Sequence, residues 1–203
     1  MTRRLLLASH NPGKLVELRR ILGAAGLDVQ LLSVDDVGPF AEVPETGATF
    51  AENALLKARA AAAATGVAAV ADDSGLCVDA LNGMPGVLSA RGSGRHGDDE
   101  ANLRLLLGQL ADIPDERRGA QFVCAAAYVD LQGHEVVVEG RVAGTLTRAP
   151  AGENGFGYDP VFVPTGEQLT TAQMSAEAKD AISHRGRAFR ALAERLRHEW
   201  PAG

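Results

Sequence analysis

The residues that decide the fold are Val67-Ala68-Ala69-Val70-Ala71-Asp72-Asp73-Ser74-Gly75-Leu76. A short apolar run ends here in two carboxylates, a hydroxyl and a glycine. The run is too short to cross a membrane and follows a helical segment, so it predicts a buried strand. Ligands in open α/β sheets lie beyond the carboxyl ends of strands, which places Asp72 and Asp73 where adjacent acids can hold a divalent cation. A solvated Asp-Asp-Ser-Gly turn is the alternative.

The bulk properties narrow the class of protein. The 203 residues suffice for one generous domain or two small lobes, and a hydrophobic fraction of 46% supplies a core. With 20 basic and 26 acidic residues, the net charge of −6 argues against a nucleic-acid partner but not against a small anionic ligand. Cys77 and Cys124 lie in apolar runs without the spacing of metal ligands, which predicts reduced thiols.

The start of the chain bears on localisation. The apolar residues that follow Arg4, Leu5 to Ala8, are too few for a signal-peptide core. No apolar run approaches the length of a transmembrane helix. We therefore expect a soluble, cytoplasmic protein with no membrane partner.

The first seventy residues predict two strand–helix units. A strand over 4–8 leads into the polar turn Ser9-His10-Asn11-Pro12-Gly13-Lys14 and a helix over 14–25. Such a turn can grip phosphate because free backbone N–H groups converge at a helix start. It lacks the glycine spacing and the hydroxyl residue of a Walker loop.

A second helix is predicted just before the Asp72-Asp73 strand. Thr49 and Glu52 form a capping box, so the helix covers about 50–64, after a loop that carries Glu42 and Glu45. Its buried face is expected to comprise Phe50, Ala54, Ala58 and Ala61. Gly66 ends this helix and returns the chain to the strand.

The second half predicts antiparallel structure. Residues 120–131 read as a long strand that is apolar on both faces, and 134–144 pair back with it as a hairpin. Before this hairpin, residues 99–110 predict a helix with a leucine stripe that belongs to a core. Antiparallel strands after strand–helix–strand units indicate a mixed sheet flanked by helices.

The last fifty residues carry further polar motifs. Phe156 lies between two glycines, which makes it either a loop plug or a stacking platform for a planar ligand. A strand over 160–163 and a short helix over 175–182, which contains Lys179, are expected next. Ser183-His184-Arg185-Gly186 then precedes the last helix, and His184 and Arg185 at that junction could point into a cleft.

Together these polar segments supply a phosphate turn, metal carboxylates, a stacking ring and base-edge donors, the parts of a magnesium-dependent nucleoside triphosphate enzyme. The sequence also resembles the inosine/xanthosine triphosphate pyrophosphatases from about Leu5 to about Leu196. The motifs that carry this resemblance, in the family's order, are Thr49-Phe50-Ala51-Glu52-Asn53-Ala54, Ala71-Asp72-Asp73-Ser74-Gly75-Leu76, Ser89-Ala90-Arg91, Gly155-Phe156-Gly157-Tyr158-Asp159-Pro160 and Ser183-His184-Arg185-Gly186. One departure is His10, which stands where the family usually has glycine in its first motif, Thr-Gly-Asn.

The resemblance implies the hydrolysis of ITP, dITP or XTP to the monophosphate and pyrophosphate, which would cleanse the nucleotide pool. It implies Mg²⁺, a homodimer, and one domain over residues 1–203 with an elongated mixed α/β fold, in which two lobes flank a central substrate cleft. Asp73 would be the catalytic acid–base residue and a metal ligand, and Glu45 a second metal ligand. The substrate would be bound by Ser9, His10, Asn11, Pro12, Gly13, Lys14, Ser74, Phe156, Gly157, Tyr158, Asp159, Lys179, His184 and Arg185.

The chemistry of these residue types agrees with those roles. A triphosphate brings about four negative charges, which magnesium and lysine must offset before a nucleophile can approach. A metal-bound water loses its proton more easily, and a nearby aspartate can accept it. Inosine and xanthosine present an acceptor at position 6, so Lys, His or Arg donors there would be left unpaired by adenine, which presents an amino group.

Two other functions fit parts of the pattern. One is a pyrophosphatase for another modified nucleotide, such as a pyrimidine triphosphate. The other is a non-catalytic nucleotide sensor. Asp72 and Asp73 beside a phosphate turn argue against the sensor, because a pure anion binder would avoid acids there.

Overall fold

The computed structural model describes residues 3–41 and 43–200, so Glu42 lies outside the described part of the chain. Strands and helices alternate in the first half as the sequence predicts, except that an unpredicted short helix, Val34–Val37, directly precedes the helix Phe50–Thr65. They are β1 (Arg3–Leu7), α1 (Pro12–Ala24), β2 (Val29–Leu32), α2 (Val34–Val37), α3 (Phe50–Thr65), β3 (Ala69–Val78), α4 (Asp99–Gln109), β4 (Gly119–Val129), β5 (Glu135–Leu146), β6 (Phe162–Pro164), α5 (Ala176–Ile182) and α6 (His184–Glu199).

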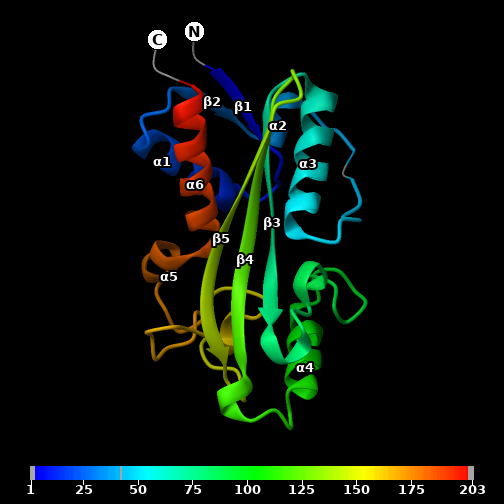
Figure 1. The fold of residues 1–203 in the computed structure, drawn as a ribbon, viewed down its shortest axis with the longest axis vertical. Coiled ribbons are helices and arrows are strands. Elements are labelled where there is room, and N and C mark those ends of the chain that lie inside the picture. Colours follow the sequence, from blue (N-terminus) through cyan, green and yellow to red (C-terminus); the bar gives the residue numbers. More distant parts are fainter. Residues whose placement is uncertain (1–2, 42, 201–203) are drawn as a thin grey trace. The chain divides into compact units, whose positions relative to one another are not determined.

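The strands form one mixed sheet in the order β2-β1-β3-β4-β5-β6 (Figure 1). Strand β1 pairs in parallel with both β2 and β3, whereas β5 and β6 are antiparallel. The predicted hairpin between β4 and β5 is present: its strands are neighbours, and Asp130 N donates to His134 O. The prediction of a mixed sheet flanked by helices is confirmed.

The chain divides into two compact units. The first comprises the described residues up to Asp73, together with Cys124–Gly140 and the described residues from Arg185 onward. The second comprises Ser74–Val123 and Arg141–His184. The chain therefore passes from the first unit to the second between Asp73 and Ser74, within β3.

The core of the first unit is built on aliphatic strand residues. Leu5 and Leu7 of β1 and Val70 of β3 are fully buried, and Phe189 and Leu192 of α6 pack in the same cluster. Leu18 and Leu22 bring α1 onto this cluster as well. Figure 1 shows α1 and α6 together on one side of these strands and α3 on the other.

Helix α3 begins and ends where the sequence predicts. Thr49 Oγ1 accepts from Glu52 N at 3.1 Å, and Glu52 Oε2 accepts from Thr49 N at 3.3 Å, which closes the capping box. Gly66 caps the other end in the left-handed region, at φ 64°. The predicted buried face is confirmed for all its members, Phe50, Ala54, Ala58 and Ala61.

Strand β3 differs from its prediction. It runs without interruption from Ala69 to Val78, so Asp72 and Asp73 lie inside the strand and not at its carboxyl end. The strand that ends beside the two carboxylates is β1, because its last residue, Leu7, pairs with Val70. The carboxylates therefore lie just past the end of β1, on the part of β3 that β1 no longer covers. Periodicity alone could not show that the backbone stays extended through two acids, since the neighbouring strands impose it.

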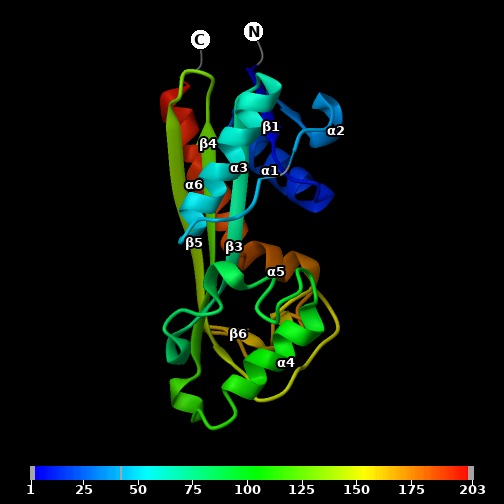
Figure 2. The same ribbon diagram turned by 90° about the vertical axis from the view of Figure 1, so that its right-hand side faces the viewer.

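The second unit has its own core. Leu106 and Leu110 of α4 pack with Leu76 and Val78 of β3, and Phe162 of β6 lies in the same cluster. Leu103 and Leu107 are partly buried against it, which confirms the predicted leucine stripe. The strand expected over 160–163 is shifted, because Asp159–Val161 form a 3₁₀ turn and β6 begins at Phe162. Figure 2 shows α4, α5 and β6, all of the second unit.

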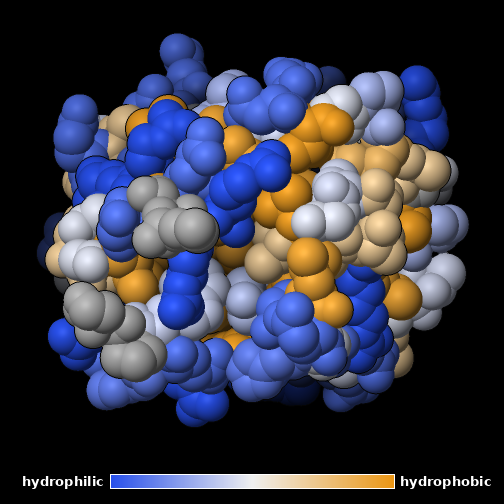
Figure 3. Space-filling view, turned by 90° about the horizontal axis from the view of Figure 1, so that it is seen from above, coloured by the Kyte–Doolittle hydropathy of each residue, from blue (hydrophilic) through white to orange (hydrophobic). Residues whose placement is uncertain are grey.

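The surface is mixed in character. Figure 3 shows hydrophilic residues over much of one face, with hydrophobic side chains exposed in part of it. Within residues 3–41 and 43–200, none of the helices combines the length and hydropathy needed to cross a bilayer.

Candidate functional site

The predicted phosphate turn is the capped start of α1. Asn11 Oδ1 accepts from Gly13 N at 2.9 Å and from Lys14 N at 3.3 Å, and Ser9 Oγ accepts from Asn11 N at 3.2 Å. The sequence predicted a helix start at Lys14, but α1 begins at Pro12. Proline suits the first helical position because it lacks the N–H that would be unsatisfied there. His10, Asn11, Pro12 and Gly13 are exposed, whereas Ser9 and Lys14 are half-buried.

Asp72 holds two cations in the first unit. Lys14 Nζ donates to both of its oxygens, at 2.8 and 2.9 Å, and Arg185 Nε donates to Oδ2 at 3.1 Å. Burial alone would raise the pKa of the Asp72 carboxyl, but the charges and hydrogen bonds of Lys14 and Arg185 hold it well below its usual range. Two cationic side chains thus share the one carboxylate of Asp72. This arrangement, the Asp72 cluster, suits an anion.

Asp73 belongs to a second cluster, in which two carboxylates share one cation. Asn53 Nδ2 donates to Asp73 Oδ2 at 3.1 Å, and Lys57 Nζ donates to Asp73 Oδ1 at 3.0 Å and to Glu45 Oε1 at 2.9 Å. Burial and the nearby Glu45 raise the pKa of Asp73, although Lys57 and Asn53 oppose the rise. Two carboxylates and one ammonium leave a net charge of −1. This arrangement, the Asp73 cluster, suits a cation.

The two clusters follow from strand geometry. Successive side chains of a β-strand point to opposite faces, so Asp72 and Asp73 are directed apart. Asp72 meets Lys14 at the start of α1 and Arg185 in the first turn of α6, whereas Asp73 meets α3. The two adjacent acids thus have different partners: Asp72 holds two cations in position, whereas Asp73 faces α3.

The Asp73 cluster fits a divalent metal ion. Glu45 and Asp73 converge on one cationic group, the Lys57 ammonium, which stands in for an ion bound by both. No group of three or more His, Cys, Asp or Glu residues with metal-site geometry occurs among the residues that the structure describes. Two carboxylates are nonetheless what Mg²⁺ commonly takes from a protein, because waters and substrate phosphates complete its coordination.

Sequence reasoning missed Asn53 and Lys57. Asn53 is fully buried on α3, with its Oδ1 accepting from Gly47 N at 2.8 Å while its amide holds Asp73. A Cβ at position 47 would come within 2.8 Å of that same Oδ1, so the close approach requires glycine. The available signal was an asparagine and a lysine four residues apart, beside the apolar face of a helix that is otherwise rich in alanine.

The second unit holds the Gly155–Asp159 loop around one buried carboxylate. Asp159 Oδ2 accepts from Phe156 N at 2.8 Å and from Lys179 Nζ, and its Oδ1 accepts from Thr171 Oγ1 at 2.8 Å. The Phe156 side chain is 64% exposed, and Lys179 Nζ lies 5.2 Å from its ring centroid. Phe156 is therefore not a loop plug, which leaves the alternative of an exposed stacking surface.

The other residues of the second unit that were predicted to bind substrate differ in burial and in the contacts they make. Tyr158 is buried, its hydroxyl donates to Ser89 O at 3.0 Å, and burial raises its pKa to about 12. Gly157 N donates to Asp99 Oδ2 at 2.9 Å, and Ser74 is half-buried in β3. His184 stacks on Phe122 with ring centroids 5.0 Å apart. The buried Tyr158 side chain thus anchors the Gly155–Asp159 loop to the backbone at Ser89.

His184 and Arg185 lie in the first turn of α6 and not in a junction before it. The helix start was set too late because glycine at position 186 reads as a break in sequence. Gly186 is instead a buried helical position, which packing against the rest of the protein stabilises.

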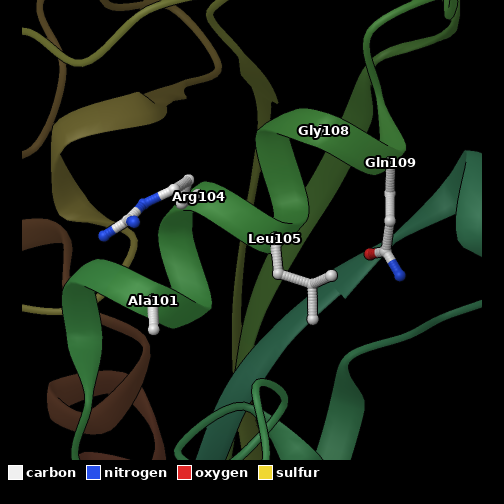
Figure 4. Close-up of a pocket in the computed structure, with 5 residues that line it drawn as sticks. All are labelled: Ala101, Arg104, Leu105, Gly108 and Gln109. Atoms are coloured by element: carbon white, nitrogen blue, oxygen red, sulfur yellow. The ribbon is translucent and has the colours of Figure 1, made fainter.

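A hollow also lies over α4 in the second unit (Figure 4). Five residues of the helix surface line it: Ala101, Arg104, Leu105, Gly108 and Gln109. Because these five include no carboxylate and none of the predicted site residues, the hollow is not the candidate site.

Comparison with known proteins identifies the family of this chain. The sequence profile described as the Ham1 family matches residues 5–195. The chain belongs to the Ham1 family. A Ham1 relative named dITP/XTP pyrophosphatase from Mycobacteroides abscessus is 62% identical over 96% of this chain and 95% of its own. One of the same name from Nocardia farcinica is 65% identical over 93% and 92%.

Solved structures of Ham1 proteins share the fold. The Staphylococcus aureus Ham1 protein superposes with a TM-score of 0.89 at 41% identity, covering 98% of this chain and all of that one. The M. abscessus nucleoside-triphosphatase / dITP/XTP pyrophosphatase superposes with a TM-score of 0.82, covering 96% of this chain and all of that one. The fold class expected from the motifs is therefore confirmed for this Ham1 chain.

Proposed function

We propose that this protein hydrolyses deaminated purine nucleoside triphosphates, namely ITP, dITP and XTP, to the monophosphate and pyrophosphate. The observation that carries the proposal is the pair of clusters on consecutive residues of β3, one with two cations around a single carboxylate and one with two carboxylates around a single ammonium. A metal-bound polyphosphate needs both a cation-binding and an anion-binding position. Relatives at 62% and 65% identity that are named dITP/XTP pyrophosphatase support the same activity.

The residues of the first unit would handle the phosphates. Lys14 and Arg185, which Asp72 holds in place, would neutralise part of the polyphosphate charge, with Ser9 to Gly13 beside them. Glu45 and Asp73 would hold Mg²⁺, which when bound supplies charge neutralisation and a more acidic water. Asp73 would accept the proton of the attacking water, a role that suits a carboxyl whose pKa is raised by burial.

The residues of the second unit would bind the base and sugar, with Ser74 as a further substrate contact. Phe156, 64% exposed, offers a face on which a purine can stack, and Asp159 fixes the backbone of its loop. Lys179 and His184 carry donors suited to the 6-oxygen of hypoxanthine or xanthine. An adenine amino group would leave such donors unpaired, which costs about 1–3 kcal/mol.

The test is an assay of ITP, dITP, XTP, dGTP and dATP with Mg²⁺, with the products identified. We expect pyrophosphate and a monophosphate from ITP, dITP and XTP, and little reaction with dATP. Orthophosphate as the product would refute the proposal. Turnover of modified pyrimidine triphosphates alone would favour the other-nucleotide function, and tight ITP binding without turnover would favour the sensor.

We also propose the setting of this activity. The protein would act in the cytoplasm as a homodimer and cleanse the nucleotide pool, with residues 1–203 forming one catalytic domain. Sedimentation equilibrium tests the dimer, and a single cooperative unfolding transition tests the single domain. A monomer at micromolar concentration, or two separate transitions, would contradict these proposals.

A further inference from the structure

Lys57 occupies the centre of the Asp73 cluster. Its ammonium lies 2.9 Å from Glu45 Oε1 and 3.0 Å from Asp73 Oδ1. The side chains of Lys57 and Glu45 are 23% and 24% exposed, and that of Asp73 is 10% exposed.

This ammonium and a metal ion compete for the same two carboxylates. Lys57 Nζ engages Glu45 Oε1 and Asp73 Oδ1, two of the oxygens with which Glu45 and Asp73 would hold Mg²⁺. A metal ion held by both carboxylates would also repel the nearby ammonium in this partly buried site. Binding of the metal ion therefore weakens the hold of the two acids on Lys57.

The cluster is built so that the lysine moves and the aspartate stays. Asp73 Oδ2 is fixed by the amide of Asn53, which is fully buried and is itself fixed by Gly47 N. Lys57 has a long flexible side chain whose ammonium, among the residues that the structure describes, is held by the two acids that the metal would take. Once displaced, its ammonium needs another anionic partner, and a polyphosphate supplies one.

We propose that Lys57 is a resident counter-ion that competes with the divalent cation for Glu45 and Asp73 and releases them when a triphosphate becomes its partner. The metal ion and the triphosphate then bind cooperatively, and Lys57 is the positioning residue that couples them. Because such coupling is reciprocal, each ligand raises the affinity for the other by the same factor. The proposal rests on the proposed function for the identity of the second ligand.

The first experiment measures Mn²⁺ affinity by electron paramagnetic resonance, with the full chain and no nucleotide. Lys57→Met removes the competing ammonium while keeping a good helix former. We expect it to bind Mn²⁺ about tenfold more tightly than the wild type, or more, since an opposite charge within ~4–6 Å changes the proton affinity of a carboxyl by that order. Adding Asp73→Asn to Lys57→Met should abolish the gain.

Two controls separate competition from a change in net charge. Arg59→Met removes a cation two residues away on α3, whose partner is Glu135 and whose side chain is 51% exposed. Lys57→Arg keeps the charge at the cluster. Both should bind Mn²⁺ within about threefold of the wild type, because exposed charges are screened and a retained cation still competes.

A second measurement tests the coupling itself. The affinity for an ITP analogue with a methylene bridge between the α and β phosphates is compared with and without saturating Mg²⁺. The ratio of the two affinities should be at least about tenfold smaller in Lys57→Met than in the wild type, by the same reciprocity. Thermal unfolding without metal should show Lys57→Met to be destabilised and Mn²⁺ to restore it, whereas a purely structural lysine would leave the response to Mn²⁺ unchanged.

The outcomes are decisive in each direction. Equal or weaker Mn²⁺ binding by folded Lys57→Met, including no binding at all, would overturn the proposal, as would an unchanged ratio for the ITP analogue. If Lys57→Met does not fold, Lys57→Gln takes its place under the same criteria. Because the first experiment contains no nucleotide, its failure is distinct from a failure to cleave ITP, which would overturn the proposed function instead.

Discussion

Replacing Asp72 with asparagine tests how the two clusters are built. Asp72 is buried and is shared by Lys14 and Arg185, whose side chains are only 18% and 17% exposed. Asp72→Asn keeps the shape but removes the counter-charge that two partly buried cations share. Breaking a buried ion pair in this way costs about 3–5 kcal/mol. At about 2–4 °C per kcal/mol for a chain of this size, Tm should fall by about 6–20 °C.

The pH dependence gives the sharper signature. Because the folded pKa of Asp72 lies well below the ordinary 3.8, its stabilisation is present above that ordinary value and is lost as the pH falls toward the folded pKa. The difference in the free energy of unfolding between the wild type and Asp72→Asn should therefore be largest near neutral pH. It should shrink as the pH falls below about 4.

The assay is urea unfolding followed by circular dichroism at several pH values. Glu135→Gln is the matched control, because it neutralises the partner of Arg59 in an ion pair whose arginine is 51% exposed. This control should cost no more than about 1 kcal/mol at neutral pH. A loss below about 1 kcal/mol for Asp72→Asn, or a difference that stays constant down to the lowest accessible pH, would refute the argument that Asp72 is the hub of two cations.

Three further predictions concern the same residues. Asp73→Asn should lower the rate of pyrophosphate release from ITP at least about 100-fold while the circular dichroism spectrum is unchanged, and near-wild-type turnover would remove Asp73 from the mechanism. Asn53→Ala should lower the free energy of unfolding by about 1–3 kcal/mol in urea, because Gly47 N loses its acceptor; a neutral result would contradict this. Phe156→Ala should weaken ITP binding by about 1–3 kcal/mol in calorimetry but change the free energy of unfolding by no more than about 0.5 kcal/mol. The control Leu169→Ala removes another exposed side chain, 48% exposed, and should have an equally small effect on stability while leaving ITP binding unchanged.

The parts of the fold that sequence predicted well are those governed by local interactions. The capping box of Thr49 and Glu52 fixes the start of α3, and Gly66 fixes its end, because both act within a few residues. The leucine stripe of α4 and the hairpin between β4 and β5 follow from periodicity and turn chemistry.

The two errors that affect the candidate site lie where distant parts of the chain decide the conformation. Asp72 and Asp73 were expected at the carboxyl end of their strand, yet they lie inside β3 because neighbouring strands hold the backbone extended. The start of α6 was set after His184 and Arg185, but Gly186 is helical because it is packed in the core. In both places tertiary packing overrides local preference.

The sequence by itself determined the mixed α/β class, the motifs of the Ham1 family and the residue types from which a metal and phosphate site could be made. Only the tertiary structure decided how those residues are paired. Asp72 and Asp73 are neighbours in the chain, but the alternation of a strand sends one to Lys14 and Arg185 and the other to Glu45, Asn53 and Lys57. Because the sign of each cluster is the sum of charges that come from distant segments, it could not be read from the local sequence.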